Sequence, residues 1–204
     1  MSAPGRAAPG DPSAEWVVLL DDDHRPCGSM LKSDVHGAET PLHLAFSVYV
    51  LNAAGQLLVT RRALGKRTWP GVWTNSCCGH PRPGEEVPAA ARRGLRQELG
   101  LTPLTMSLAL PDFSYRAVSA EGLVENELCP VFLAHVDTEP AVDPSEADEW
   151  RWVAWPVFHE ATRLVPWAFS PWSVAQTQLL DALDAPDAPD APGGPGGPGA
   201  AEPG

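Results

Sequence analysis

Residues Gly79–Leu101 read GHPRPGEEVPAAARRGLRQELGL, and this stretch decides the fold. Val87 and Pro88 predict the first turn of a helix, because proline has a suitable fixed φ and its missing N–H is not needed there. The helix is expected to run to Glu98, with Gly100 ending it. Carboxylates one turn apart on such a helix can share a hard cation with phosphate oxygens. Taken alone, the pattern also fits an amphipathic helix with a solvated Glu/Arg face.

The spacing within this stretch resembles the Nudix box, a loop–helix–loop motif whose glutamates hold Mg²⁺ against a diphosphate. Matching positions are occupied by Gly79, Glu85, Arg93 and Glu98. Two box glutamates are missing, since Gly94 and Gln97 stand in their places. The resemblance implies an α/β (α+β) protein, a Nudix-type α/β/α sandwich with a mixed sheet, an additional N-terminal strand segment and a C-terminal helix. The incomplete box favours diphosphate binding without ordinary hydrolysis and leaves Glu98 as a ligand for Mg²⁺.

The flanking sequence is more specific than the box. Five further segments occur in a fixed order: Thr60–Leu64, Trp69–Pro81, Tyr115–Ala117, Glu125–Glu127 and Pro166–Trp172. Together they resemble the type I isopentenyl-diphosphate delta-isomerases, a branch of the Nudix superfamily, over roughly residues 16–180. The resemblance implies an isomerase that shifts the double bond of isopentenyl diphosphate to give dimethylallyl diphosphate, a step of isoprenoid precursor biosynthesis.

The allylic shift needs one group that donates a proton and one that accepts a proton. The resemblance assigns these tasks to Cys78 and Glu127, and a thiol can exchange a proton near neutrality. Tyr115 matches a tyrosine that hydrogen-bonds the glutamate. Trp172 matches a tryptophan near the cationic carbon, where an indole face can stabilise positive charge, and it can also anchor the final helix. Cys77, beside Cys78, is expected to be a small buried filler.

The resemblance also implies two places for metal ions. Glu125 and Glu127 lie two residues apart in an expected strand, so both carboxylates face one side. With three histidines they form the implied ligand set of the first metal: His36, His43, His80, Glu125 and Glu127. Such a set suits Mn²⁺, Mg²⁺, Zn²⁺ or Fe²⁺. A second ion, Mg²⁺, is implied to bridge Glu98 to the diphosphate, whose other contacts are Lys32, Arg62 and Lys66.

Composition narrows the classes of partner. The formal charge of −12, from 26 acidic against 14 Lys and Arg residues, argues against generic binding to nucleic acid or an anionic membrane. No apolar run is long enough to span a bilayer, and the N-terminus has no apolar leader segment. Four cysteines, two of them adjacent, predict free thiols in a reducing cytoplasm. No G-x-G-x-x-G fingerprint occurs, so neither flavin nor nicotinamide is expected. We expect a cytoplasmic monomer that acts on a small diphosphate.

The chain is expected to hold one folded domain, residues 15–183, between two disordered tails. Residues 1–14 are rich in Ala, Pro, Gly and Ser, and residues 184–204 form a Pro/Gly/Ala/Asp tract. Alternating patterns predict strands and helices within the domain. The strands are 15–20, 43–51, 56–60, 107–115, 125–136 and 149–154, and the further helices are 156–162 and 170–183.

Two other functions fit part of the pattern. A Nudix hydrolase could cleave a nucleoside diphosphate derivative, but the depleted glutamates and the pair Cys78 and Glu127 speak against it. A non-catalytic diphosphate-binding module is the third reading, although it has no need of a Cys–Glu–Tyr set with three histidines. Product analysis with isopentenyl diphosphate separates the three, because each gives a different outcome: double-bond shift, phosphate release or no change.

Overall fold

The computed structural model describes residues 15–180. Both proposed tails, residues 1–14 and 184–204, lie outside the described residues, as does the last part of the helix expected to reach residue 183. Within the described part, no helix is long and apolar enough to cross a membrane.

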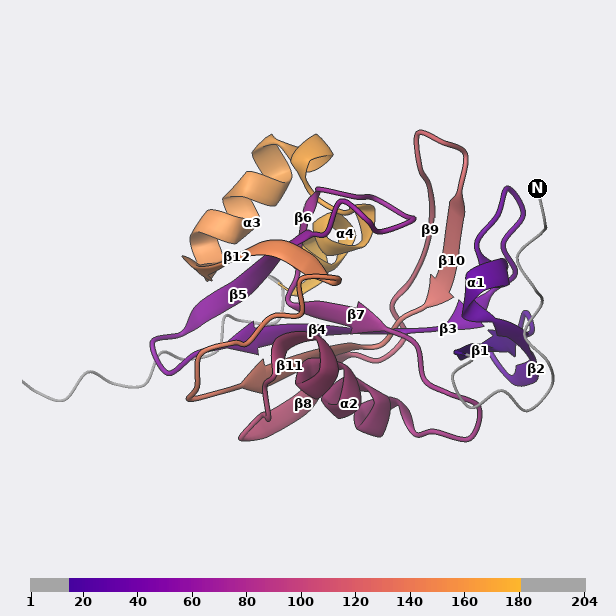
Figure 1. Cartoon of the computed structure of the whole chain (residues 1–204), viewed down its shortest axis with the longest axis horizontal. Helices are drawn as coiled ribbons and strands as arrows, with labels where there is room; N and C mark the ends of the chain where they lie inside the picture. The colour runs from indigo at the N-terminus through magenta and orange to yellow at the C-terminus, as the bar shows by residue number, and fades with distance from the viewer. Residues whose placement is uncertain (1–14, 181–204) are drawn as a thin grey trace, which may run out of the picture.

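A mixed seven-stranded sheet forms the centre of the molecule (Figure 1). Its main path runs β12-β5-β4-β11-β8, with β6 paired to β5 and β7 paired to β4. β4 and β11 are parallel, and the other pairs are antiparallel. The strands are β4 (Phe46–Leu51), β5 (Gln56–Arg62), β6 (Trp73–Thr74), β7 (Cys77–Gly79), β8 (Thr105–Leu110), β11 (Val131–His135) and β12 (Ala147–Ala154).

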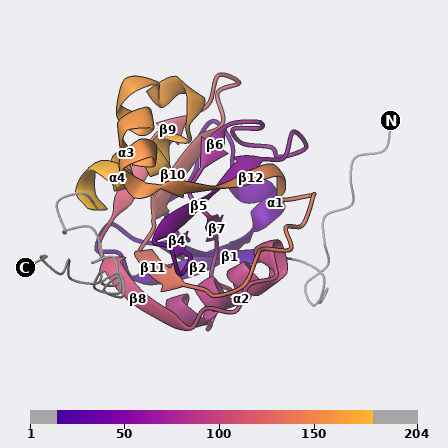
Figure 2. The same cartoon turned by 90° about the vertical axis from the view of Figure 1, so that its left-hand side faces the viewer.

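Helices cover both faces of this sheet, which gives the expected α/β/α sandwich. Figure 1 shows α2 (Val87–Leu99) below the sheet, with α3 (Trp155–Leu164) and α4 (Pro171–Leu180) above it. A short 3₁₀ turn, η1 (Pro166–Ala168), joins the two upper helices. Figure 2 shows the same layers end-on.

The sheet therefore has two hydrophobic cores. On the α2 side, Leu95 and Leu99 pack with Phe46, Val48 and other buried strand residues. Trp150 and Trp152 also pack against this core, as their alternation along the strand predicts. On the α3/α4 side, a second core is built from Tyr49, Leu57, Val59, Phe158 and Trp172, among others.

A second, five-stranded sheet extends the sandwich at the end where the N-terminal segment lies (Figure 1). Its order is β2-β1-β3-β10-β9. The strands are β1 (Trp16–Leu20), β2 (Pro26–Leu31), β3 (His43–Leu44), β9 (Ser114–Val118) and β10 (Val124–Leu128), and the one-turn helix α1 (Lys32–Val35) follows β2. The expected N-terminal strand segment is thus confirmed, whereas β2 and α1 carried no clear sequence signal.

Three predicted strands are each divided between the two sheets. The strand expected over 43–51 is interrupted at Ala45, whose N–H donates to Leu128 O at 2.8 Å. The strand expected over 107–115 breaks after β8, where Pro111 begins the turn to β9. The strand expected over 125–136 breaks at Cys129 and Pro130, because proline has no N–H for the ladder. The single-strand predictions were wrong here, and the breaks create the corner where the sheets meet.

The helix of the opening stretch agrees with its prediction. It spans Val87–Leu99, and Gly100 follows in the left-handed conformation with φ 65°. Its N–H donates to Arg96 O, as a glycine at this helix end commonly does. The turn between β4 and β5 is closed by Asn52, whose Oδ1 accepts hydrogen bonds from Ala54 N and Gln56 N. At the last helix, Ser170 Oγ accepts from Ser173 N at 3.3 Å and caps the N-terminus of α4.

Candidate active site

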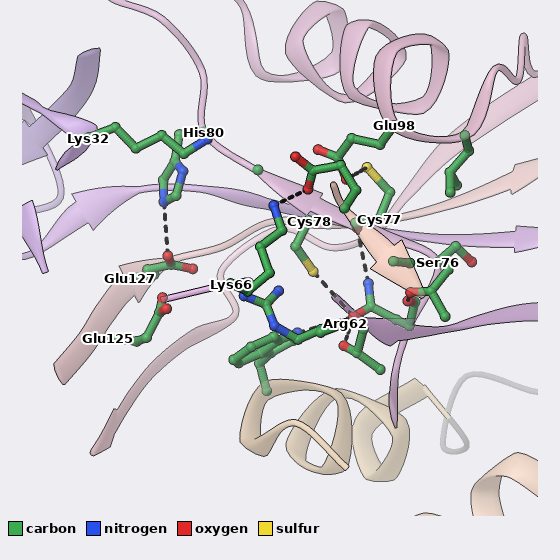
Figure 3. A pocket seen from close by; sticks show the side chains of 18 of the residues that line it. Lys32, Arg62, Lys66, Ser76, Cys77, Cys78, His80, Glu98, Glu125 and Glu127 are labelled. Atoms are coloured by element: carbon green, nitrogen blue, oxygen red, sulfur yellow. Dashed lines mark hydrogen bonds and ion pairs between the residues drawn. The ribbon is translucent and has the colours of Figure 1, made fainter. Parts of the chain in front are cut away.

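A cavity at the junction of the two sheets collects most of the residues singled out from the sequence (Figure 3). We call it the central cavity. Strands of both sheets contribute to its wall, together with α1, α2 and α4. The predicted site residues on the wall are Lys32, Arg62, Lys66, Cys78, His80, Glu98, Tyr115, Glu125, Glu127 and Trp172. Segments far apart in the sequence therefore meet in one place.

The three predicted histidine ligands converge on Glu127. Candidate ligand atoms of His36, His43, His80 and Glu127 all lie within 4.8 Å of one another. Glu127 Oε1 is 3.0 Å from His80 Nε2 and 3.4 Å from His43 Nε2. The fifth predicted ligand is adjacent, because Glu125 Oε2 lies 3.4 Å from His36 Nε2. We call these five residues the His/Glu cluster.

Backbone pairing explains part of this convergence. β3 and β10 run parallel, and their register places His43 directly beside Glu127. His80 follows the end of β7, and His36 ends the one-turn helix α1. The cluster thus ties the N-terminal segment to the sandwich.

The residues of the cluster fit a divalent metal ion. Nε2 of His36 and Nε2 of His43 are buried and have no hydrogen-bond partner within the described residues. His43 Nδ1 lies 2.9 Å from Pro41 O, so this nitrogen carries the proton and leaves the Nε2 lone pair free for a cation. Unpaired buried nitrogens are costly, and a metal ion removes that cost.

Glu127 is set up as a carboxylate. Burial alone would raise the pKa of Glu127, but the His43 and His80 rings, when protonated in the metal-free cluster, hold this pKa well below its usual value. The phenol oxygen of Tyr115 lies 2.9 Å from Glu127 Oε2 and 3.3 Å from Glu125 Oε2. Burial, reinforced by Glu127 and Glu125, raises the pKa of Tyr115, so its hydroxyl stays protonated and donates to the carboxylates.

The adjacent cysteines have different surroundings, and Figure 3 shows their sulfurs pointing apart. Cys78 points into the central cavity, where its sulfur lies 3.2 Å from Asn75 Oδ1. Burial raises the pKa of Cys78 to about 12, so the thiol is neutral in this environment. Cys77 packs in the core beside α2, and its thiol donates to Glu98 Oε2 at 3.4 Å. Its predicted burial is confirmed.

Trp172 lies where either of its two predicted roles would place it. It is buried in the core under α4, and its ring also lines the central cavity. Its indole N–H donates to Asn75 Oδ1 at 3.1 Å, which fixes the ring plane. The rings of Trp69 and Tyr115 pack against it at centroid distances of 5.6 and 5.8 Å. The cavity therefore has an aromatic wall that can face a positively charged carbon.

Three of the predicted basic residues also line the cavity: Lys32, Arg62 and Lys66. Lys66 forms an ion pair with Glu146, and Lys32 forms one with Glu15 at 2.7 Å. The Arg62 guanidinium donates to the carbonyls of Thr68 and Trp69 and lies 5.3 Å from the Trp172 ring centroid. An adjoining hollow of about 520 Å³ shares Lys32 and Lys66 with the central cavity and adds Arg67.

Glu98 is the remaining carboxylate of the box helix at the cavity. Burial, with the nearby carboxylate of Glu146, raises the pKa of Glu98 to about 7. Position 94 cannot supply a second carboxylate, because a Cβ added to Gly94 would lie 2.8 Å from Phe46 Cζ. Arg92 and Arg96, two residues before and after Gly94, are not among the residues that line the described hollows.

Four further residues contact the candidate site residues and were not predicted from the sequence. Glu146 pairs with Lys66, and Asn75 accepts from Cys78 and Trp172. Ser47 and Gln176 lie behind Cys78 in the core. Asn75 stood inside the motif around Cys78 and could have been found there, whereas the other three carry no local pattern.

The comparisons with known proteins agree with this architecture. Residues 41–172 match the model of the NUDIX domain family. A crystal structure of a protein from Deinococcus radiodurans superposes with a TM-score of 0.63 over 80% of this chain and 98% of its own, at 21% sequence identity. That likeness concerns the fold. The chain is a NUDIX domain protein with three histidines at its candidate site.

Relatives of much higher sequence identity show to which family within the NUDIX domain proteins the chain belongs. An isopentenyl-diphosphate Delta-isomerase of Frankia alni is 60% identical over 173 residues, which is 85% of this chain and 88% of the relative. One from Agromyces mediolanus is 54% identical over 179 residues, covering 87% of each chain. The chain belongs to the isopentenyl-diphosphate Delta-isomerase family.

Proposed function

We propose that this chain interconverts isopentenyl diphosphate and dimethylallyl diphosphate by proton transfer at two groups of one cavity, Cys78 and Glu127. The observation that carries the proposal is their convergence: both line the central cavity, together with Tyr115 and Trp172. Moving the double bond requires a proton to be added at one carbon and another removed two bonds away. A cavity with a thiol and a carboxylate on separate strands meets that need.

The surroundings of each group support its part. Cys78 is held as a neutral thiol and Glu127 as a carboxylate that accepts a hydrogen bond from Tyr115. Because the reaction is reversible, each group donates a proton in one direction and accepts one in the other. The face of Trp172 stabilises positive charge that develops at the tertiary carbon between them.

We propose that the His/Glu cluster binds Mn²⁺ or another divalent metal such as Zn²⁺ or Fe²⁺. Three imidazoles with two carboxylates suit such ions. The bound ion supplies a fixed positive charge beside Glu127, which orients the carboxylate and lowers its affinity for a proton. His36, His43, His80, Glu125 and Glu127 are the residues that hold it.

The diphosphate is proposed to lie against the basic residues of the cavity. Lys32, Arg62 and Lys66 line the cavity and supply cationic donors. Glu98 would hold Mg²⁺ against the phosphate oxygens. These oxygens would take the ligand positions that the two missing box glutamates leave empty. Binding of the diphosphate there directs the hydrocarbon towards Cys78 and Trp172.

Other features of the proposal concern context. Proton transfer requires neither flavin nor nicotinamide, so no redox cofactor is included. The protein is proposed to act as a cytoplasmic monomer without nucleic-acid or membrane partners, in line with its formal charge of −12. Residues 15–183 are proposed to form one folded domain.

The test is product analysis with isopentenyl diphosphate in the presence of Mg²⁺ and Mn²⁺. We expect dimethylallyl diphosphate to appear and, in deuterated water, to carry deuterium from solvent, because each cycle exchanges a carbon-bound proton. Phosphate release is measured in parallel. Hydrolysis without a double-bond shift would replace the proposal by a Nudix hydrolase, and binding without turnover would leave a diphosphate-binding module.

A further inference from the structure

Behind Cys78 lies a set of buried polar side chains that the proposed mechanism does not use. Ser47 on β4 and Gln176 on α4 are both fully buried and do not line the described hollows. Ser47 Oγ lies 3.2 Å from Cys78 Sγ and 3.3 Å from Cys129 Sγ. Buried polar groups are kept only when they are hydrogen-bonded, so their arrangement is informative.

The direction of the hydrogen bonds is fixed at the Gln176 end. The Tyr49 hydroxyl donates to Gln176 Oε1 at 3.1 Å, and Gln176 Nε2 donates to Ser47 Oγ at 2.9 Å. An amide NH₂ group can only donate, so Ser47 accepts from Gln176. The hydroxyl proton of Ser47 is therefore left to point at one of the two sulfurs.

The direction is also fixed at the other end. Asn75 Nδ2 donates to Val48 O and Cys77 O, each at 3.1 Å, which turns Asn75 Oδ1 towards Cys78. An amide oxygen can only accept, so the resting thiol donates its proton to Asn75. Because the Cys78 proton goes to Asn75, the hydrogen bond between Ser47 and Cys78 requires the Ser47 hydroxyl to donate. The hydrogen bonds then run in one direction, from Gln176 to Ser47, from Ser47 to Cys78 and from Cys78 to Asn75.

We propose that Ser47, directed by Gln176, is a positioning residue for Cys78: its hydroxyl holds the sulfur in place and stabilises the negative charge formed there when the thiol gives its proton to the substrate. In that step the S–H bond breaks and its electron pair stays on sulfur, while the π electrons of the substrate double bond form the new C–H bond and leave the positive charge on the tertiary carbon. Asn75 Oδ1 cannot stabilise this charge, since it has no proton to donate. The inference rests on the proposed role of Cys78.

The experiment is steady-state kinetics of Ser47→Ala, Gln176→Leu and the double variant, with isopentenyl diphosphate. Loss of one hydrogen bond to a charged group predicts a kcat about 10- to 100-fold lower for Ser47→Ala. KM stays unchanged, because Ser47 does not line the cavity. Gln176→Leu lowers kcat by a smaller factor, and the double variant is no worse than Ser47→Ala, since both changes interrupt one chain.

Two controls separate positioning from loss of packing. Ser173→Ala removes a fully buried hydroxyl whose bonds stay within Ser170 and the start of α4, and it should leave kcat unchanged. Cys129→Ala removes the other sulfur next to Ser47 and should leave kcat within about twofold, as a bystander does. If Ser47→Ala retained full kcat, or if Cys129→Ala lost as much as Ser47→Ala, the inference would be wrong.

The outcome for Cys78→Ala keeps the inference distinct from the proposed function. An inactive Cys78→Ala with a fully active Ser47→Ala overturns the positioning role alone. An active Cys78→Ala overturns the proposed mechanism. If Ser47→Ala does not fold, Gln176→Leu carries the test, because it leaves the Ser47 hydroxyl present but frees its direction.

Discussion

The two ends of the central cavity differ in the number of protein ligands that they offer to a metal ion. At one end the His/Glu cluster brings five candidate ligands from separate segments close together, and each of its three histidines has a buried ring nitrogen without a hydrogen-bond partner in the described part of the chain. At the other end the box helix offers Glu98 alone, because Gly94 and Gln97 replace two carboxylates of the motif. The first end can hold a metal with protein ligands only, whereas the second needs the phosphate oxygens of a substrate.

The largest expected difference is between Cys77 and Cys78, because Cys78 points into the central cavity whereas Cys77 packs in the core beside α2. Cys78→Ala should lower kcat by about 10²- to 10⁴-fold, the usual contribution of a positioned proton-transfer group. Cys77→Ala should retain most of the activity, since that thiol contacts Glu98 in the core. Isomerisation assays of the two variants, with thermal unfolding as the control for folding, give the answer. An inactive Cys77→Ala beside an active Cys78→Ala would reverse the assignment.

The pH dependence of the Mg²⁺ requirement sharpens the contrast. The pKa of Glu98 is raised to about 7, so its carboxylate is ionised above this pH and protonated below it. With the His/Glu cluster loaded, the Mg²⁺ concentration for half-maximal rate should rise as pH falls from about 8 to 6. Glu146→Gln removes a like charge beside Glu98 and should shift this rise to lower pH. Identical profiles in the two proteins would show that Glu98 does not bind the ion.

The smallest expected effect is on stability, and it concerns why position 94 of the box helix carries no carboxylate. Gly94→Ala should lower the free energy of unfolding by about 1–3 kcal/mol, because the added methyl group overlaps the buried Phe46 ring. Gly65→Ala is the matched control, since a Cβ there meets nothing within 4 Å. Chemical denaturation measures both. Phe46→Leu in the Gly94→Ala background should restore part of the loss, and equal stability of Gly94→Ala and the parent chain would contradict the packing argument.

The sequence foretold some elements better than others for identifiable reasons. The helix from Val87 was predictable because Pro88 and Gly100 mark its two ends. The break at Ala45 was not, because no turn residue marks the passage of the chain from one sheet to the other. Pro111 and Pro130 did carry a signal for such breaks, and the apolar patterns around them concealed it.

The candidate site divides in the same way. Cys78, His80 and Glu127 lie in motifs that a family resemblance can assign position by position. Ser47 and Gln176 are ordinary residues of a strand and a helix. Only their hydrogen bond in the folded core connects them with the candidate site. Glu146 is similar, since its contact with Lys66 joins segments 80 residues apart. Long-range contacts of this kind are properties of the packed chain.

The central claim is that the His/Glu cluster holds a metal ion that the isomerisation requires. The most direct measurement is metal content after reconstitution, together with isomerase activity, for the parent chain, His36→Ala, Glu125→Gln and the control His135→Ala. His135 is exposed and lies outside the cluster, so its variant should match the parent chain. We predict one tightly bound metal ion per parent chain, lost on His36→Ala together with activity, weakened on Glu125→Gln and partly rescued there by excess metal. Full metal content and full activity in His36→Ala and Glu125→Gln would contradict the account.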